Sequence, residues 1–224
     1  MSLCSKHPAA FFKTCGITSI EDAHRCLEAG ASALGLIFVP ETPRYVSVQR
    51  AKAIRAAIPS GIACVGVFQN QSIDEIQSIT DQVGLHAVQL HGIETPDAFS
   101  DLAVPMIKTL FLRKPHWPLK PMIAAWQRPA RQGRLMAWLI EDALKQPQSL
   151  HWSEALNALA LPEDVPIWIA GGLTPDNVSS VWQQASGKVF GLDVAGGIEA
   201  SAGIKSPEKL LAWQQALAGS FRLC

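Results

Sequence analysis

A cysteine near the start of the sequence, Cys15, has the surroundings of a reacting thiol. The apolar residues 9–12 predict a short buried strand that delivers Cys15, and Gly16 allows the chain to turn after it. A hydroxyl–carboxylate pattern over residues 18–22 predicts that a helix begins there. A thiol between a strand and a helix start is a candidate reacting group. The other interpretation is a small buried cysteine that only packs.

Other polar side chains stand at or just after apolar runs further along the chain. If these runs are parallel strands, their carboxyl ends gather the polar groups on one face with the thiol. The residues concerned are Arg44, Asn70, Gln89, His91, Lys108, Glu141, Asp142 and Asp193.

Three of these side chains have chemistry suited to a small anionic substrate, and each also has a simpler explanation. Arg44 can pair bidentately with a carboxylate, or be a solvated loop arginine. His91 can shuttle protons, or be a hydrogen-bonded structural residue. Asp193 can orient backbone or a substrate hydroxyl, or cap a turn. Gln89 beside His91 is a further candidate for substrate binding.

The elements that must position these groups alternate regularly between strand and helix. Eight short apolar runs predict strands at residues 9–12, 33–39, 62–68, 86–90, 104–111, 135–140, 165–170 and 189–194. Helical patterns cover residues 20–29, 48–58, 72–82, 94–102, 175–185 and 207–217. The least regular stretch, residues 113–133, is predicted to be a loop with one short helix over residues 123–127.

Eight strands alternating with helices predict a single-domain α/β fold, the closed (β/α)8 TIM barrel, through right-handed parallel crossovers. The alternative is an open doubly wound sheet. That fold would normally carry a dinucleotide loop after the first strand, and no G-x-G-x-x-G motif occurs there. The barrel is therefore preferred.

Two pairs of glycines follow the seventh and eighth strands, where barrels often bind phosphate. Gly171 and Gly172 end one strand, and Ala195 and Gly196 begin a second glycine turn. Backbone N–H groups at such turns approach anions closely. Ordinary turns also need glycine, but two pairs in these two places predict a phosphosugar site.

The composition narrows the class of protein. Lysine plus arginine equals aspartate plus glutamate at 19 each, so no charge excess indicates nucleic acid or an anionic membrane as a partner. No apolar run has the length of a membrane span. Five cysteines without a close pair indicate neither a disulfide framework nor a metal site. Residues 1–8 lack a signal-peptide pattern and are expected to form a loose extension of a cytoplasmic protein.

Several stretches resemble the phosphoribosylanthranilate isomerase family, (β/α)8 enzymes of tryptophan biosynthesis. Their order and spacing hold over nearly the whole chain. The matching stretches are Lys13-Thr-Cys-Gly-Ile-Thr18, Gly35-Leu-Ile-Phe38, Thr42-Pro-Arg-Tyr-Val46, Val65-Gly-Val-Phe68, Val88-Gln-Leu-His-Gly92, Ala170-Gly-Gly-Leu173, Gly191-Leu-Asp193, Gly197-Ile-Glu199 and Gly203-Ile-Lys205.

The resemblance implies an Amadori rearrangement of N-(5′-phosphoribosyl)anthranilate to 1-(2-carboxyphenylamino)-1-deoxyribulose 5-phosphate. It assigns Cys15 as the general base that takes the C2′ proton. Arg44 would hold the anthranilate carboxylate, and the turns at Gly171-Gly172 and Ala195-Gly196 would hold the phosphate. The implied partner is this phosphorylated small molecule, no metal or organic cofactor is implied, and a monomer or a homodimer fits equally well.

One region departs from the family, which carries an aspartate as general acid after the sixth strand and then a glycine-rich loop. Here no glycine lies between Arg134 and Trp152. Aligning the tryptophan without gaps places Ile140 at the acid's position. Asp142 would share its side of the strand, whereas Glu141 would need a bulge or a gap. We therefore expect Asp142, narrowly ahead of Glu141, to be the acid.

A second class of function remains open from the sequence. The chain could be a diverged barrel that binds a phosphorylated metabolite without this chemistry, or that isomerises another aminosugar phosphate. The two classes differ in whether a carboxylate from Glu141 or Asp142 faces Cys15 across the mouth of the barrel.

Overall fold

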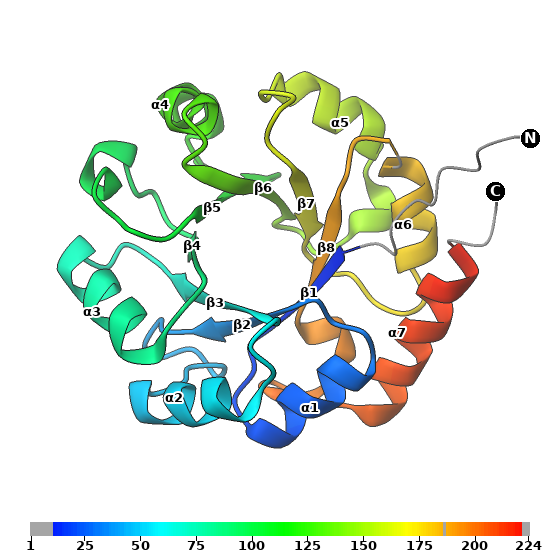
Figure 1. Cartoon of the computed structure of the whole chain (residues 1–224). Coiled ribbons are helices and arrows are strands. Elements are labelled where there is room, and N and C mark those ends of the chain that lie inside the picture. Colours follow the sequence, from blue (N-terminus) through cyan, green and yellow to red (C-terminus); the bar gives the residue numbers. More distant parts are fainter. Residues whose placement is uncertain (1–10, 186, 221–224) are drawn as a thin grey trace, which may run out of the picture.

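A computed structural model describes residues 11–185 and 187–220, and it has the predicted barrel architecture. Eight parallel strands pair in sequence order, and β1 pairs with β8 to close the ring (Figure 1). The expected extension over residues 1–8, and the start of the first predicted strand at residues 9–10, lie outside the described residues. The strands are β1 (Phe11–Cys15), β2 (Ala33–Ile37), β3 (Ala63–Phe68), β4 (Ala87–Leu90), β5 (Met106–Leu112), β6 (Leu135–Asp142), β7 (Ile167–Ala170) and β8 (Gly191–Val194).

Alternation along the strands divides the apolar side chains into two packed layers. One layer fills the barrel and is built from small and large side chains of successive strands. It contains Ala33, Val65, Ala87, Ile107, Ala137, Leu139, Trp168 and Ala170. The other layer, which includes Phe12, Trp138 and Ile140, packs between strands and helices. The strands are buried on both faces, which is why they appear in the sequence as continuous apolar runs.

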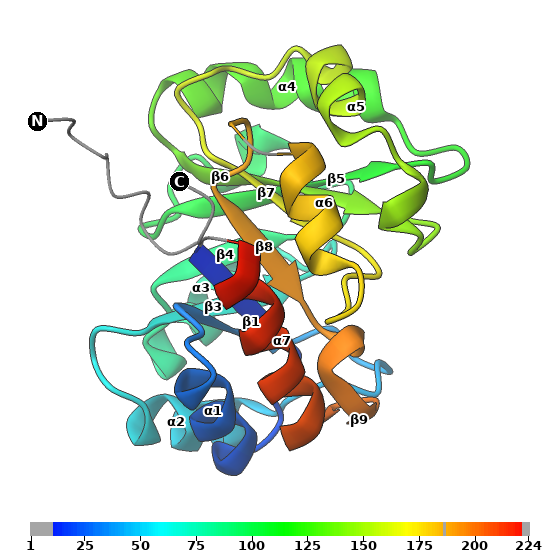
Figure 2. The same cartoon turned by 90° about the vertical axis from the view of Figure 1, so that its right-hand side faces the viewer.

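Helices surround the sheet on its outer side (Figures 1 and 2). The first three begin at serines whose side chains accept a backbone N–H from the first turn, namely Ser19, Ser47 and Ser72. The helices are α1 (Ile20–Glu28), α2 (Val48–Ala57), α3 (Ile73–Val83), α4 (Leu119–Arg131), α5 (Trp152–Leu159), α6 (Val178–Ala185) and α7 (Pro207–Ser220).

The structure differs from the sequence prediction mainly between β4 and β7. Residues 113–133 are not chiefly a loop, because α4 is 13 residues long. Its buried residues Met122, Ile123, Trp126 and Ala130 recur at helical spacing, which outweighs the effect of Pro129 in the last turn. The expected helix over residues 94–102 is only a short 3₁₀ turn at Pro96–Phe99. The sequence prediction did not include α5.

The loop after β8 holds further small elements that the sequence did not predict. A 3₁₀ turn, Gly196–Ile198, leads into a hairpin of β9 (Glu199–Ser201) and β10 (Ile204–Lys205). The hairpin brings Glu199 and Lys205 back beneath the carboxyl end of the barrel, where both side chains are buried.

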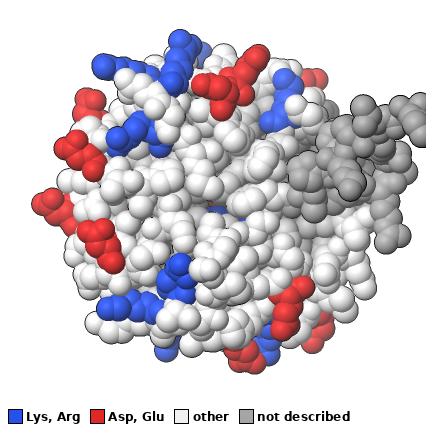
Figure 3. Space-filling model, viewed as in Figure 1, with Lys and Arg blue, Asp and Glu red and all other residues white. Residues whose placement is uncertain are grey.

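The surface carries charges of both signs without a large area of one sign on the face seen in Figure 3, whose middle is mostly uncharged. Within the described part of the chain, no helix combines the length and the apolar character that crossing a bilayer requires.

A buried ion pair stabilises the loop after β4. The Lys108 ammonium lies 2.6 Å from Oε2 of Glu94 and also donates to the carbonyl of Gly92 at 2.7 Å. The same carboxylate accepts the backbone N–H groups of Gly92 and Asn70. Lys108 therefore stabilises this loop through its ion pair with Glu94 and is not one of the polar residues at the mouth of the barrel.

We predict that Lys108→Ala lowers the free energy of unfolding by about 3–5 kcal/mol, because it leaves the buried Glu94 carboxylate without its counter-charge. Urea unfolding measures the change. The control is Lys52→Ala on the exposed face of α2, which should change stability by less than about 0.5 kcal/mol. A loss for Lys108→Ala no larger than that of the control would contradict the assignment.

Candidate active site

The mouth of the barrel at the carboxyl ends of the strands collects most of the polar residues singled out in the sequence. Cys15 and Asp193 project inward from β1 and β8, Gln89 and His91 from the end of β4, and Glu141 from β6. Along each strand these residues alternate with apolar residues that face outward. They therefore share the inner face of the barrel, and the strand ends bring them close together.

Cys15 is 8% exposed, and its thiol lies against Gly35 of the neighbouring strand. A side chain on Gly35 would collide with the sulfur, so the glycine provides the space that the thiol occupies. Burial raises the pKa of Cys15, while the positive charge of Lys13 partly offsets that rise. The thiolate, once formed, is thus a strong base beside a fixed positive charge.

Lys13 is fully buried and joins β1 to β8. Its Nζ lies 2.7 Å from Oδ2 of Asp193. Burial lowers the pKa of Lys13, but the charges of Asp193 and Cys15 raise it more, so that it stays above its ordinary value. Oδ1 of Asp193 is buried and has no hydrogen-bond partner among the described residues. This oxygen is available to a ligand hydroxyl.

Gln89 and His91 form a polar cluster with Thr109 of β5. The Gln89 amide nitrogen lies 3.3 Å from Nδ1 of His91 and 3.4 Å from the Thr109 hydroxyl. Burial, reinforced by the surrounding lysines, lowers the pKa of His91 to about 3, so the imidazole is neutral at neutral pH. Oε1 of Gln89 is a second buried acceptor without a partner in the described structure.

Glu141 faces the interior of the mouth, with Oε2 at 3.6 Å from Nε2 of His91. Burial, and then the charge of Asp193, raise its pKa to about 7, although Lys145, Lys114 and Lys13 act in the opposite direction. A carboxyl with this pKa exchanges its proton near neutrality, as a general acid must.

Asp142 points the other way, which reverses the preference drawn from the sequence. Its carboxylate is fully buried and accepts Nε and Nη2 of Arg113 at 2.8 and 2.6 Å. It also accepts the backbone N–H groups of Leu144 and Gln146. The sequence comparison assumed a loop of unchanged length before Trp152, but Ile140 packs in the outer layer against the helices, so its neighbour Glu141 faces inward.

Arg44 lies near the thiol but is already paired. Its Nε and Nη2 bind the two oxygens of Glu199 at 2.9 and 2.6 Å, and Lys205 binds the same carboxylate at 3.0 Å. The hydrogen bonds to Glu199 raise the pKa of Arg44. Lys205 also donates to the Cys15 carbonyl at 2.7 Å, so the network connects Arg44 to the end of β1 at Cys15.

Lys13, Thr109, Glu199 and Lys205 were not among the sequence-based candidates. Lys13 had a detectable signal, since it stands two residues before Cys15 in an apolar strand and therefore shares its face. Glu199 and Lys205 end two of the stretches that resemble the family, but their meeting under the mouth was not predicted, because the hairpin that brings them there was not.

The glycine turns after β7 and β8 lie against neighbouring loops. A side chain on Gly171 or Gly172 would collide with the backbone of Asp142 or Lys145. In the described part of the chain, the N–H groups of Gly172, Leu173 and Ala195 have no hydrogen-bond acceptor. Gly196 lies near the Arg44 guanidinium. Close packing thus explains the glycines, and the unpaired N–H groups form a feature suited to an anion.

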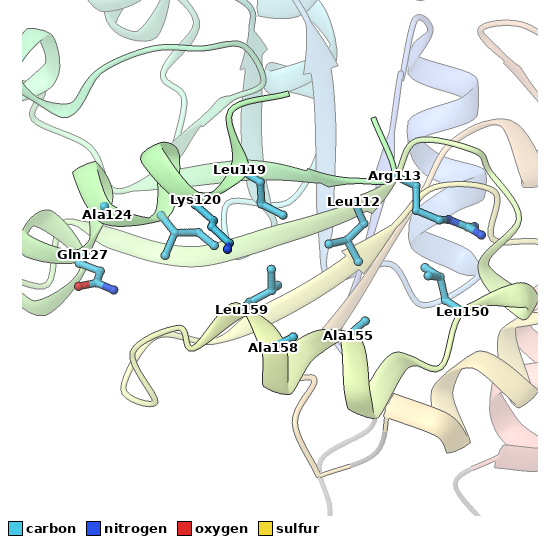
Figure 4. Close-up of a pocket in the computed structure, with 11 residues that line it drawn as sticks. Leu112, Arg113, Leu119, Lys120, Ala124, Gln127, Leu150, Ala155, Ala158 and Leu159 are labelled. Carbon is cyan, nitrogen blue, oxygen red and sulfur yellow. The ribbon is translucent and has the colours of Figure 1, made fainter. Parts of the chain in front are cut away.

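An apolar groove of about 470 Å³ lies elsewhere, between α4 and α5 on the outer side of the barrel (Figure 4). Leu112, Leu119, Leu150 and Leu159 point into it. None of the inward-facing residues of the mouth lines it.

Comparisons with known proteins agree with this geometry. Residues 12–216 match the family model described as N-(5'phosphoribosyl)anthranilate (PRA) isomerase. The chain belongs to this family. It is 39% identical over 210 residues to N-(5'-phosphoribosyl)anthranilate isomerase of Pseudomonas savastanoi pv. phaseolicola, covering 93% of this chain and 97% of that relative.

Solved structures of phosphoribosylanthranilate isomerases have the same fold. The enzyme from Thermus thermophilus is 31% identical with a TM-score of 0.75, over 93% of this chain and 98% of that one. Another, in complex with reduced 1-(o-carboxyphenylamino)-1-deoxyribulose 5-phosphate, is 28% identical with a TM-score of 0.76, over 94% and 99% of the two chains. This member of the family thus keeps the barrel over nearly its whole length.

We predict that Glu141 titrates with a midpoint near pH 7, being protonated below it and ionised above it. Carbon-13 NMR of protein labelled at the glutamate carboxyls measures the midpoint, and Glu141→Gln identifies the resonance. A midpoint near the ordinary glutamate value of about 4.3 would contradict the orientation described here.

Proposed function

We propose that this chain catalyses the isomerisation of N-(5′-phosphoribosyl)anthranilate to 1-(2-carboxyphenylamino)-1-deoxyribulose 5-phosphate. The observation that carries the proposal is the shared mouth of Cys15 and Glu141, a base and a proton donor on strands that are not neighbours in the barrel. Membership of the family supports this reaction over a barrel that only binds a phosphorylated metabolite or acts on another aminosugar phosphate.

The first step proposed is opening of the ribose ring. Glu141, in its protonated form, donates to the ring oxygen while the nitrogen lone pair forms a bond of Schiff-base character to C1′ and the C1′–oxygen bond breaks. Asp142 takes no part in proton transfer, because Arg113 holds it away from the mouth.

The second step is removal of the C2′ proton. The Cys15 thiolate takes this proton, and the electrons of the C2′–hydrogen bond neutralise the Schiff base to give an enolamine. Return of a proton to C1′ and loss of the hydroxyl proton from C2′ complete the ketone. Lys13 stabilises the thiolate throughout, since its positive charge lowers the pKa of the thiol.

Substrate recognition uses the groups that the fold leaves without partners. The buried acceptors of Gln89 and Asp193 suit the sugar hydroxyls. His91, neutral and next to Glu141, is a further sugar contact. The Nη1 of Arg44, which Glu199 does not engage, remains as a donor for the anthranilate carboxylate. The turns at Gly171-Gly172 and Ala195-Gly196 take the phosphate through backbone N–H groups.

The setting proposed for this activity is the cytoplasm, with a phosphorylated small molecule as partner and no role for nucleic acid. The sequence-based expectation of a monomer or a homodimer stays a prediction.

We predict that Cys15→Ser lowers isomerase turnover by at least about a hundredfold while the protein stays folded, because a hydroxyl is a far poorer proton acceptor at neutral pH than a thiolate. A fluorescence assay that follows consumption of the anthranilate substrate measures turnover, and circular dichroism checks folding. Wild-type protein unable to rescue a tryptophan auxotroph that lacks this step would contradict the proposed function.

A further inference from the structure

The turn between β6 and α5 carries a lysine, Lys145, at the place where the sequence lacks the glycine-rich loop. Lys145 has a left-handed backbone, with φ of 54°, a conformation that glycine adopts more readily. Its N–H donates to the Asp142 carbonyl at 3.0 Å, which closes the turn. Lys145 is one of six non-glycine residues with a positive φ in the described structure, so its use has to be argued from its surroundings.

Arg113 and Asp142 hold this turn in place. Beyond its bidentate contact with Asp142, the Arg113 guanidinium donates to the Gln146 carbonyl at 3.0 Å and to the Ser149 hydroxyl at 2.8 Å. The Asp142 carboxylate in turn accepts the Gln146 N–H at 2.7 Å. Five charge-assisted hydrogen bonds around one turn leave little freedom to the backbone of Lys145.

The backbone of Lys145 lies directly against the first of the proposed phosphate turns. A side chain on Gly172 would collide with the Lys145 backbone, so the two loops touch. Gly172 and Leu173 carry two of the N–H groups that have no acceptor among the described residues. Lys145 is therefore anchored beside the amides expected to bind an anion.

The Lys145 ammonium is solvent-exposed and has no ion-pair partner within the described ranges. Its charge lowers the pKa of both Glu141 and His91, two titratable groups of the mouth. Because the Cα of Lys145 lies against Gly172, its flexible side chain is long enough for the ammonium to reach an anion held on the N–H groups of the β7 turn.

We propose that Lys145 binds the phosphate of the substrate together with the N–H groups of Gly172 and Leu173, in place of the glycine-rich loop that this chain lacks. The inference rests on the proposed function for the location of the phosphate. A lysine supplies a full charge where a glycine loop supplies only backbone dipoles, so one residue compensates for several donors.

The test uses inorganic phosphate as the probe, with calorimetry on the unliganded protein in a phosphate-free buffer. Lys145→Gln keeps most of the side-chain length and removes the charge. We expect it to weaken phosphate binding about tenfold, the loss of one charge-assisted hydrogen bond. Lys145→Arg should keep affinity close to that of the wild type, because it keeps the charge.

The matched control is Lys114→Ala. Lys114 is a second lysine whose charge reaches Glu141, but its ammonium lies over the rings of Phe111 and Trp117, at 3.9 and 4.3 Å from their centroids. Among the described residues, no hydrogen bond or ion pair joins Lys114 to the β7 turn. Its removal should therefore leave phosphate affinity unchanged, so the pair of variants separates a local contact from a general loss of positive charge.

Equal phosphate affinity in Lys145→Gln and wild type would overturn the proposal, as would equal losses in Lys145→Gln and Lys114→Ala, or wild-type protein that binds no phosphate. Because calorimetry does not depend on turnover, the two hypotheses are separable. Phosphate binding through Lys145 in a protein without isomerase activity would contradict the proposed function and leave this inference standing.

Discussion

Alternation of side chains along the parallel strands decides which residues of this barrel can react. Every second residue near a strand's carboxyl end faces the interior, and its neighbours face the helices. This alternation places Cys15 at the mouth on the same side of its strand as Lys13. It also places Glu141 at the mouth and turns its neighbour Asp142 away from it. A shift of one residue in β6 would exchange the two carboxylates, giving the mouth the one that now stabilises a loop.

Several charged side chains are buried in the interior. Each of them either pairs with a group of opposite charge or belongs to the candidate site. Lys13 pairs with Asp193 across the seam between β1 and β8, and Lys205 and Arg44 share Glu199 beneath the mouth. Burying such groups costs free energy that pairing only partly offsets. Their concentration around one thiol is more easily explained by chemistry than by stability.

The fold could be predicted from the sequence because eight apolar runs with regular spacing leave few alternatives. The candidate site was partly predictable, since Cys15, His91 and Asp193 lie at or next to the carboxyl ends of strands that were well defined in the sequence. The orientation of Glu141 was not, because it depends on the parity of one strand before a loop of altered length. The network of Glu199 and Lys205 could not be predicted for a different reason. The hairpin of β9 and β10 brings these residues to the mouth, and the sequence pattern did not predict this hairpin.

The most direct test of this account compares kcat for Glu141→Gln and Asp142→Asn, each measured on folded protein. If Glu141 is the proton donor, its variant loses kcat by about 10²–10⁴. The Asp142 variant should lose stability through its broken contact with Arg113, while the folded fraction retains most of its kcat. The reverse order, with Asp142→Asn inactive and Glu141→Gln active, would contradict the assignment of the two carboxylates.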